Sequence, residues 1–83
     1  MKDTLLFLLS KIVDNPDALL IDERSEGSKI ILAVHADQKD MGKIIGKNGR
    51  IIRALRDLIK LMATKENAYV DVVVVEEASE SRE

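Results

Sequence analysis

Two glycines three residues apart, Gly46 and Gly49, interrupt a helical stretch near the middle of this chain. Glycine adopts positive φ without steric cost and allows other groups to approach the backbone closely. Before this break, residues 41–45 supply only about one helical turn, and from Arg50 a longer amphipathic pattern begins. The pattern predicts a short helix, a tight loop and a long helix in direct succession, and any fold of this chain must contain that unit.

The flanking sequence supplies one more helix and three strands. Apolar residues recur at helical spacing over residues 5–13, and an Asp-Asn-Pro sequence at residues 14–16 ends that helix because the residue before a proline leaves the helical region. An extended run follows, and a turn signal at residues 25–28 joins it to a β-rich segment over residues 29–35, which predicts a hairpin. Residues 69–75 are almost all β-branched and predict a further strand.

The predicted order is therefore α-β-β-α-α-β, in a chain of 83 residues that has room for one domain. Strands mixed with paired helices in a small chain favour an α+β fold, with a three-stranded sheet and helices packed on one face. Asp40 precedes the short helix and is a candidate N-cap. The weak alternation of Val72 to Val75 predicts that part of the last strand is covered on both faces or contacts a partner.

We expect a folded domain over residues 1–76 and a frayed, acidic segment over residues 77–83. No apolar run approaches the roughly 20 residues that span a bilayer, and the N-terminus lacks the small-residue cleavage site of a signal peptide. Cysteine is absent, so no disulfide framework is possible. These features predict a cytoplasmic protein that does not bind a membrane.

Charge is distributed unevenly along the chain, although the net charge is only −2. The window from Lys39 to Lys65 holds eight basic and two acidic residues, a net charge of +6. The rest of the chain holds five basic and thirteen acidic residues, a net charge of −8. This division predicts a basic side on an acidic domain, suited to a polyanion. A Lys/Arg-rich helix surface arising by chance is the alternative.

The glycine loop itself favours an anion. It leads into a helix N-terminus, where free backbone N–H groups and the helix dipole attract negative charge, and Lys47 and Arg50 add formal charge there. A P-loop does not fit, because the spacing is one residue short and Asn48 replaces the metal-binding hydroxyl. A dinucleotide-binding loop does not fit either, because that loop follows a strand. A G-x-x-G loop between two helices is the form that clamps a nucleic-acid backbone.

Catalysis and metal binding have little support in the sequence. No Ser/His/Asp or Cys/His set is available, and the single histidine, His35, has no second ligand at metal-binding spacing. We therefore expect a protein that is not an enzyme, with no cofactor, no metal ligands, no catalytic residues and no small-molecule substrate.

The nine residues Ile44 to Ile52 resemble the I-I-G-x-x-G-x-x-I core of KH domains, and the element order resembles the type II, bacterial arrangement. Over residues 1–76 the chain is similar to the KhpA-type family of small bacterial proteins that consist of one KH domain. The resemblance implies that single-stranded RNA lies in a groove formed by the two central helices, their loop and an adjacent strand, for which we expect residues 30–34. The implied RNA-binding residues are Lys43, Ile44, Ile45, Gly46, Lys47, Asn48, Gly49, Arg50, Ile52 and Arg53.

Within that set the resemblance assigns different roles. Lys47 and Asn48 offer backbone N–H groups to phosphate at the loop apex, and Ile44, Ile45 and Ile52 form an apolar floor under the bases. The alternatives are that the two glycines serve a plain helix–turn–helix connection and that the three isoleucines belong to the core. With one Phe and one Tyr, the chain lacks the aromatic platform of RRM or OB-type binders, so we expect modest affinity and weak sequence preference.

The resemblance also implies partners and a cellular role. It suggests an RNA chaperone or post-transcriptional regulator that forms a homodimer or pairs with a larger KH-containing protein of the KhpB (Jag/EloR) type. In that family the pair is linked to cell-wall synthesis and cell shape. Two alternatives remain open: a dimerisation module for which RNA binding is secondary, and a helix-turn-helix protein that binds DNA.

Overall fold

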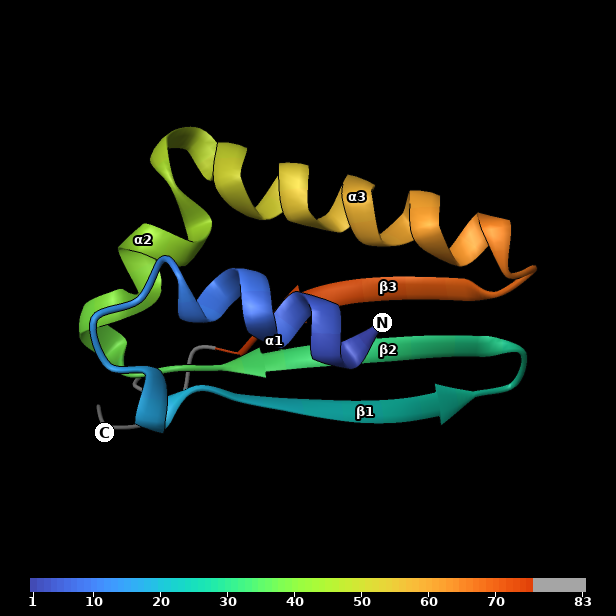
Figure 1. The fold of residues 1–83 in the computed structure, drawn as a ribbon, viewed down its shortest axis with the longest axis horizontal. Coiled ribbons are helices and arrows are strands. Elements are labelled where there is room, and N and C mark those ends of the chain that lie inside the picture. The colour runs from blue at the N-terminus through green and yellow to red at the C-terminus, as the bar shows by residue number, and fades with distance from the viewer. Residues whose placement is uncertain (76–83) are drawn as a thin grey trace.

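The computed structural model describes residues 1–75, so the predicted acidic segment over residues 77–83 lies outside the described residues. Its elements follow the predicted order, with three additional 3-10 turns (Figure 1). They are α1 (Lys2–Ser10), η1 (Pro16–Ala18), β1 (Leu20–Glu26), β2 (Lys29–His35), η2 (Gln38–Asp40), α2 (Met41–Ile45), η3 (Lys47–Gly49), α3 (Arg50–Lys65) and β3 (Tyr69–Val74). Within residues 1–75, no helix is both long and apolar enough to cross a membrane.

The three strands form one mixed sheet in the order β1-β2-β3. β1 and β2 are antiparallel and are joined by a tight turn in which Gly27 has φ 64°, whereas β2 and β3 are parallel. Parallel neighbours need a crossover connection, and here α2, η3 and α3 provide it. The G-x-x-G unit is therefore part of the connection that builds the sheet.

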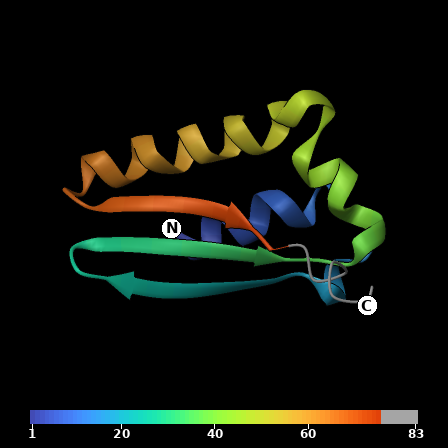
Figure 2. The same ribbon diagram turned by 180° about the vertical axis from the view of Figure 1, so that it is seen from behind.

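Both α1 and α3 lie on one face of the sheet (Figures 1 and 2), which confirms the predicted α+β architecture. The core forms where alternate strand residues meet the apolar stripes of these helices. Its largest fully buried members are Leu5, Leu9, Leu32, Val34, Ile44, Ile59, Val70 and Val72. The loop unit is thus fixed to the core at both ends, through Ile44 before it and Ile52 after it.

The last strand alternates more than its sequence predicts. Val72 faces the helices and is fully buried, whereas Val73 is 37% exposed on the opposite face. Among residues 1–75, nothing covers Val73 fully, so the prediction that β3 is covered on both faces is wrong at this residue. The alternative, that β3 contacts a partner, stays a prediction. At the outer edge of β3, the Val72 N–H donates to the Asp71 carboxylate (2.9 Å) and the Val72 carbonyl accepts from Arg56 Nε (3.1 Å). These side chains close part of the sheet edge.

Candidate nucleic-acid interface

The loop over residues 46–49, called the GxxG loop from here on, is a tight turn in left-handed backbone. Gly46 and Gly49 have φ 78° and 72°, and Asn48 between them has φ 57°. Asparagine is among the few residues other than glycine that adopt this conformation readily. The Gly46 N–H donates to the Gly42 carbonyl (2.8 Å), and the Gly49 N–H donates to the Gly46 carbonyl (3.0 Å). The turn leaves Lys47 and Asn48 exposed at its apex.

The two glycines are required for different reasons. A Cβ at Gly46 would lie 2.6 Å from Cγ1 of Ile51 and 2.9 Å from its Cβ, so a side chain there collides with the first turn of α3. A Cβ at Gly49 would meet no heavy atom within 4 Å, so only its positive φ favours glycine. Sequence reasoning did not place Ile51 at the site, because its spacing is typical of a core residue.

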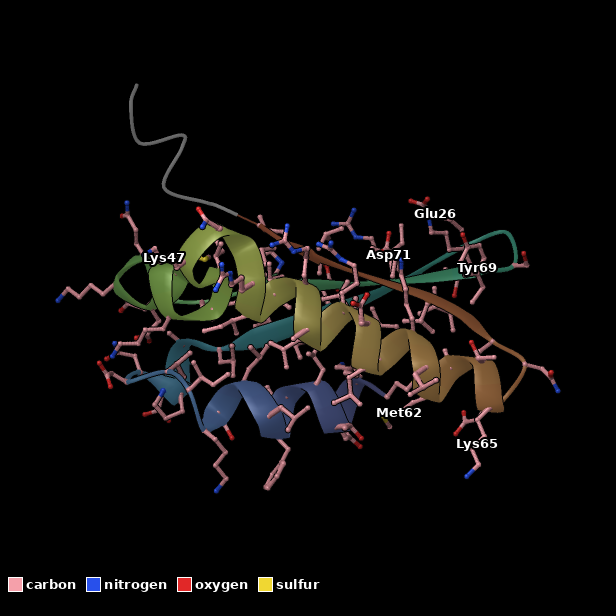
Figure 3. The ribbon with its side chains drawn as sticks, turned by 90° about the horizontal axis from the view of Figure 1, so that it is seen from above. Glu26, Lys47, Met62, Lys65, Tyr69 and Asp71 are labelled. Atoms are coloured by element: carbon pink, nitrogen blue, oxygen red, sulfur yellow. The ribbon has the colours of Figure 1, made fainter. Side chains whose placement is uncertain are left out.

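Basic side chains continue from the loop along α3. Lys47, Arg50 and Arg53 are all exposed, and the Arg53 guanidinium donates to the Asn48 carbonyl (2.9 Å), which ties α3 to the loop. Figure 3 shows Lys47 at one end of the molecule and Lys65 and Tyr69 at the other. The basic end therefore combines three cations with the N-terminus of a 16-residue helix.

Arg53, Arg56 and Lys60 follow at helical spacing and form what we call the basic row. Arg56 Nε and Lys60 Nζ lie 3.7 and 3.9 Å from Oδ1 of Asp71 on the edge strand. The row therefore runs from the GxxG loop along the side of α3 that borders β3. Within residues 1–75 the carboxylates of Asp57 and Asp71 accompany the three cations of the row, so its net charge stays positive.

Asp40 holds the base of this unit in place. Its carboxylate is 1% exposed and accepts from the backbone N–H groups of Asp14 (3.0 Å) and Asn15 (3.0 Å), and from the Asn15 side-chain amide (3.3 Å). The Asp14 hydrogen bond lowers the pKa of Asp40, burial opposes this, and the Asn15 bonds lower it further. Asp40 does occupy the N-cap position of α2, but its side chain makes no cap hydrogen bond. The predicted capping role is therefore wrong, and the carboxylate instead joins α2 to the segment after α1.

Within residues 1–75, Lys43 is the one predicted RNA-binding cation that pairs with a carboxylate. Its ammonium donates to the Asp14 carboxylate, and that hydrogen bond raises the pKa of Lys43. The segment between α1 and η1 passes beside α2 and brings the two side chains together (Figure 1).

The predicted apolar floor lies mostly inside the protein. Ile44 is fully buried and Ile52 is 7% exposed, so both belong to the core and offer almost no surface to a base. Ile45 is partly exposed and packs against the core from outside it. The helical spacing of these isoleucines suggested a floor under the bases, but the same spacing is typical of residues that pack into the core.

That residues 30–34 face the RNA stays a prediction, and their place in the sheet does not favour it. These residues belong to β2, which is the central strand of the sheet and pairs on both sides. Leu32 and Val34 are buried under the helices. Among residues 1–75, the edge strand that borders α3 is β3.

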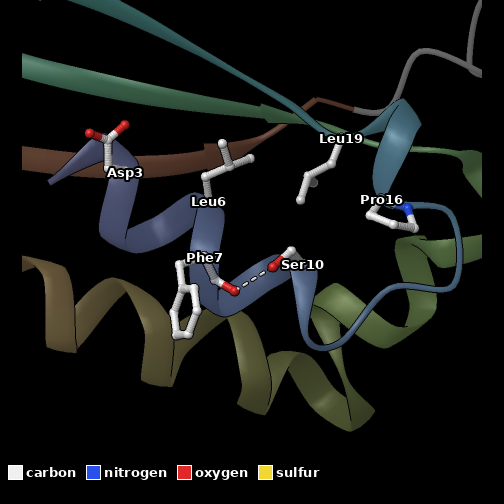
Figure 4. A pocket seen from close by; sticks show the side chains of 6 residues that line it. All are labelled: Asp3, Leu6, Phe7, Ser10, Pro16 and Leu19. Carbon is white, nitrogen blue, oxygen red and sulfur yellow. Dashed lines mark hydrogen bonds between the residues drawn. The ribbon is translucent and has the colours of Figure 1, made fainter.

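A pocket of about 380 Å³ lies elsewhere, between α1 and η1 (Figure 4). It is lined by Asp3, Leu6, Phe7, Ser10, Pro16 and Leu19. Four of these residues are apolar, Ser10 adds a hydroxyl and Asp3 a carboxylate, and no cation is among them, so the pocket does not suit phosphate. Within residues 1–75, no group of three or more His, Cys, Asp or Glu side chains is arranged to hold a metal ion.

Comparison with known proteins gives one family. The KH-domain model described as "KhpA/KhpB, KH domain" matches residues 2–74. The chain is 41% identical over 75 residues to the RNA-binding protein KhpA of Clostridium acetobutylicum, covering 90% of this chain and all of the relative. It is 44% identical over 64 residues to KhpA of Caldanaerobacter subterraneus subsp. tengcongensis, covering 77% and 85% of the two chains.

A relative of lower identity gives the same result. The RNA-binding protein KhpA of Chlamydia pneumoniae is 36% identical over 77 residues, covering 93% of this chain and 99% of the relative. No solved structure matches the chain. Because the family model spans the described fold from α1 to β3 and the relatives align over nearly their full lengths, the chain belongs to the KhpA/KhpB family of KH domains.

Proposed function

We propose that this protein binds single-stranded RNA through the GxxG loop. The observation that carries the proposal is the loop geometry: a left-handed turn exposes Lys47 and Asn48 directly before the N-terminus of α3, and Arg50 and Arg53 flank it. Backbone N–H groups, a helix dipole and three cations at one point complement a phosphate backbone. The relatives named as RNA-binding proteins support RNA as the polyanion.

The basic row extends this surface beyond the loop. A strand held at the GxxG loop would continue past Arg53, Arg56 and Lys60, between α3 and the edge of β3. Since Ile44 and Ile52 are buried, base contacts would fall on Ile45, Ile51 and the β3 edge. Phosphate contacts then dominate, which predicts weak sequence preference and strong dependence on salt.

The test compares two variants with the same change in charge. Lys47→Asp/Asn48→Asp introduces two carboxylates at the loop, and Lys65→Asp/Asn67→Asp makes the same exchange at the opposite end of α3 (Figure 3). We expect the loop variant to lose RNA affinity more than tenfold, because two phosphate contacts become repulsive, and the control to lose much less. Circular dichroism of both variants checks that they remain folded. Equal affinity for the two variants would reject the loop as the binding site.

The family resemblance supports a wider role. We infer an RNA chaperone or post-transcriptional regulator in the cytoplasm, acting with a KhpB-type partner in cell-wall synthesis and cell-shape control. Duplex DNA that competes with single-stranded RNA for the loop would favour the helix-turn-helix alternative instead.

Self-association is a second candidate function, and the outer face of α3 favours it. Leu58 and Leu61 are 43% and 69% exposed, and with Ile51 they form an apolar line at spacings of seven and three residues. Such spacing suits pairing of two helices. Sedimentation at micromolar concentration without RNA tests this: we expect a dimer in the parent protein and a monomer in Leu58→Glu. A monomeric parent protein would reject it.

A further inference from the structure

The pairing of Lys43 with Asp14 has a consequence for RNA binding, and the inference drawn from it rests on the function proposed above. Lys43 lies in the last turn of α2, three residues before Gly46, so its ammonium belongs to the basic surface around the GxxG loop. A carboxylate at this place opposes the phosphate backbone that the surface would bind. Its position therefore needs an explanation.

The Asp14 carboxylate is placed there by a buried anchor. The Asp14 backbone N–H donates to Asp40 Oδ1 (3.0 Å), and Asn15 binds the other oxygen of the same carboxylate through its backbone N–H (3.0 Å). Asp40 is almost completely buried, so the backbone at Asp14 is fixed relative to α2. A freely placed surface acid would not be held beside one particular lysine in this way.

The pair itself is accessible to a competitor. The side chains of Lys43 and Asp14 are 46% and 73% exposed. Exposed ion pairs contribute little free energy because water screens them, so a phosphate that arrives with several other contacts can displace the carboxylate. Lys43 can therefore exchange one anion for another without unfolding α2.

We propose that Asp14 competes with RNA phosphate for Lys43 and so limits the affinity of the GxxG surface. Asp40 acts as the positioning residue for Asp14. While Lys43 is paired with Asp14, it binds no counterion that RNA could displace, so one favourable contribution to RNA affinity is lost. The lower affinity favours rapid release of RNA. The same arrangement makes Asp14 a determinant of affinity although it contributes no attraction of its own to RNA.

The test is a double-mutant cycle of Asp14→Asn and Lys43→Gln in the full chain, with an unstructured single-stranded RNA oligonucleotide as the probe. Asparagine preserves the size of residue 14 and its backbone bond to Asp40. We expect Asp14→Asn to bind RNA about two- to fivefold more tightly at low salt. The slope of log affinity against log salt should steepen by about 0.7, the value for one further phosphate contact on a single strand. In the Lys43→Gln background, Asp14→Asn should give no gain.

Asp17→Asn is the matched control, because it removes one charge from the same segment at an exposed position in η1. We expect its effect to be smaller than that of Asp14→Asn and unchanged by Lys43→Gln. Weaker or unchanged binding by Asp14→Asn would overturn the proposal, and so would a gain that persists without Lys43. If Lys47→Asp/Asn48→Asp abolishes binding while Asp14→Asn gives no gain, the competition is rejected and the proposed function stands. If the loop variant binds normally, the proposed function itself is rejected.

Discussion

At the scale of single residues, the GxxG loop depends on Gly46 more than on Gly49. Alanine at Gly49 adopts the left-handed helical conformation, which costs about 1–2 kcal/mol. Gly46 has φ 78° and ψ 171°, a region that is almost restricted to glycine and costs alanine about 1–3 kcal/mol. Only at Gly46 does the added methyl group also overlap Ile51, which adds about 1–3 kcal/mol of strain. We therefore expect Gly46→Ala to lower the free energy of unfolding clearly more than Gly49→Ala in urea denaturation. Equal losses would show that the contact with Ile51 does not constrain the loop.

A second residue-scale prediction concerns acid and Asp40. The pKa of Asp40 in the folded protein lies below its unfolded value of about 3.9, chiefly because the Asp14 N–H donates to the carboxylate. Its contribution to stability is therefore complete above about pH 5 and is lost as the pH falls through the folded pKa. We expect the melting temperature of Asp40→Asn to be lower than that of the parent protein at pH 7. Below pH 5 the melting temperature of the variant should fall less steeply with pH than that of the parent protein. Parallel pH curves for the two proteins would contradict this account.

At the scale of elements, the outer edge of β3 is held by a side chain of α3. Arg56 Nε donates to the Val72 carbonyl, whereas Lys60 contributes only a partly exposed ion pair with Asp71. We expect Arg56→Ala to lower the free energy of unfolding by about 0.5–1.5 kcal/mol, the usual contribution of one hydrogen bond. Lys60→Ala should cost less, because exposed pairs contribute little. If urea denaturation showed a larger loss of unfolding free energy for Lys60→Ala than for Arg56→Ala, the Arg56–Val72 hydrogen bond would not be the main contact at this edge.

The elements also show what the sequence could and could not predict. The spacing of the apolar residues correctly predicted β2, α2 and α3. In these segments the apolar pattern and the turn-forming residues indicate the same boundaries. β1 extends through polar residues to Glu26, since it pairs with β2 along its whole length, up to Glu26 opposite Lys29. Pairing across the sheet, not local propensity, sets that boundary.

The candidate site was predicted in part for a similar reason. Local backbone chemistry identified the GxxG loop and its cations, because glycine spacing and charge are visible in the sequence. Three-dimensional contacts decided the rest: Ile44 and Ile52 pack into the core, and Asp40 binds residues that lie 25 and 26 positions away. No periodic pattern encodes contacts of that range.

At the scale of the whole molecule, cations gather at the end that carries the GxxG loop and along α3, while β1 and the α1–η1 segment carry most of the acidic residues among residues 1–38. This division allows a protein of net charge −2 to bind a polyanion on one side. We expect RNA affinity to fall steeply between low and physiological salt, measured by fluorescence anisotropy. Affinity that is independent of salt would contradict an interface made of phosphate contacts.

The most direct test of the central claim is a titration of the isotopically labelled protein with single-stranded RNA, followed by backbone amide NMR. We expect chemical shifts to change first at Gly46 to Arg50 and then along the basic row to Lys60. The pocket between α1 and η1 and the β1–β2 turn should remain unchanged. Changes concentrated at that pocket or on the sheet face opposite α1 and α3, with the loop amides unmoved, would contradict RNA binding at the GxxG loop.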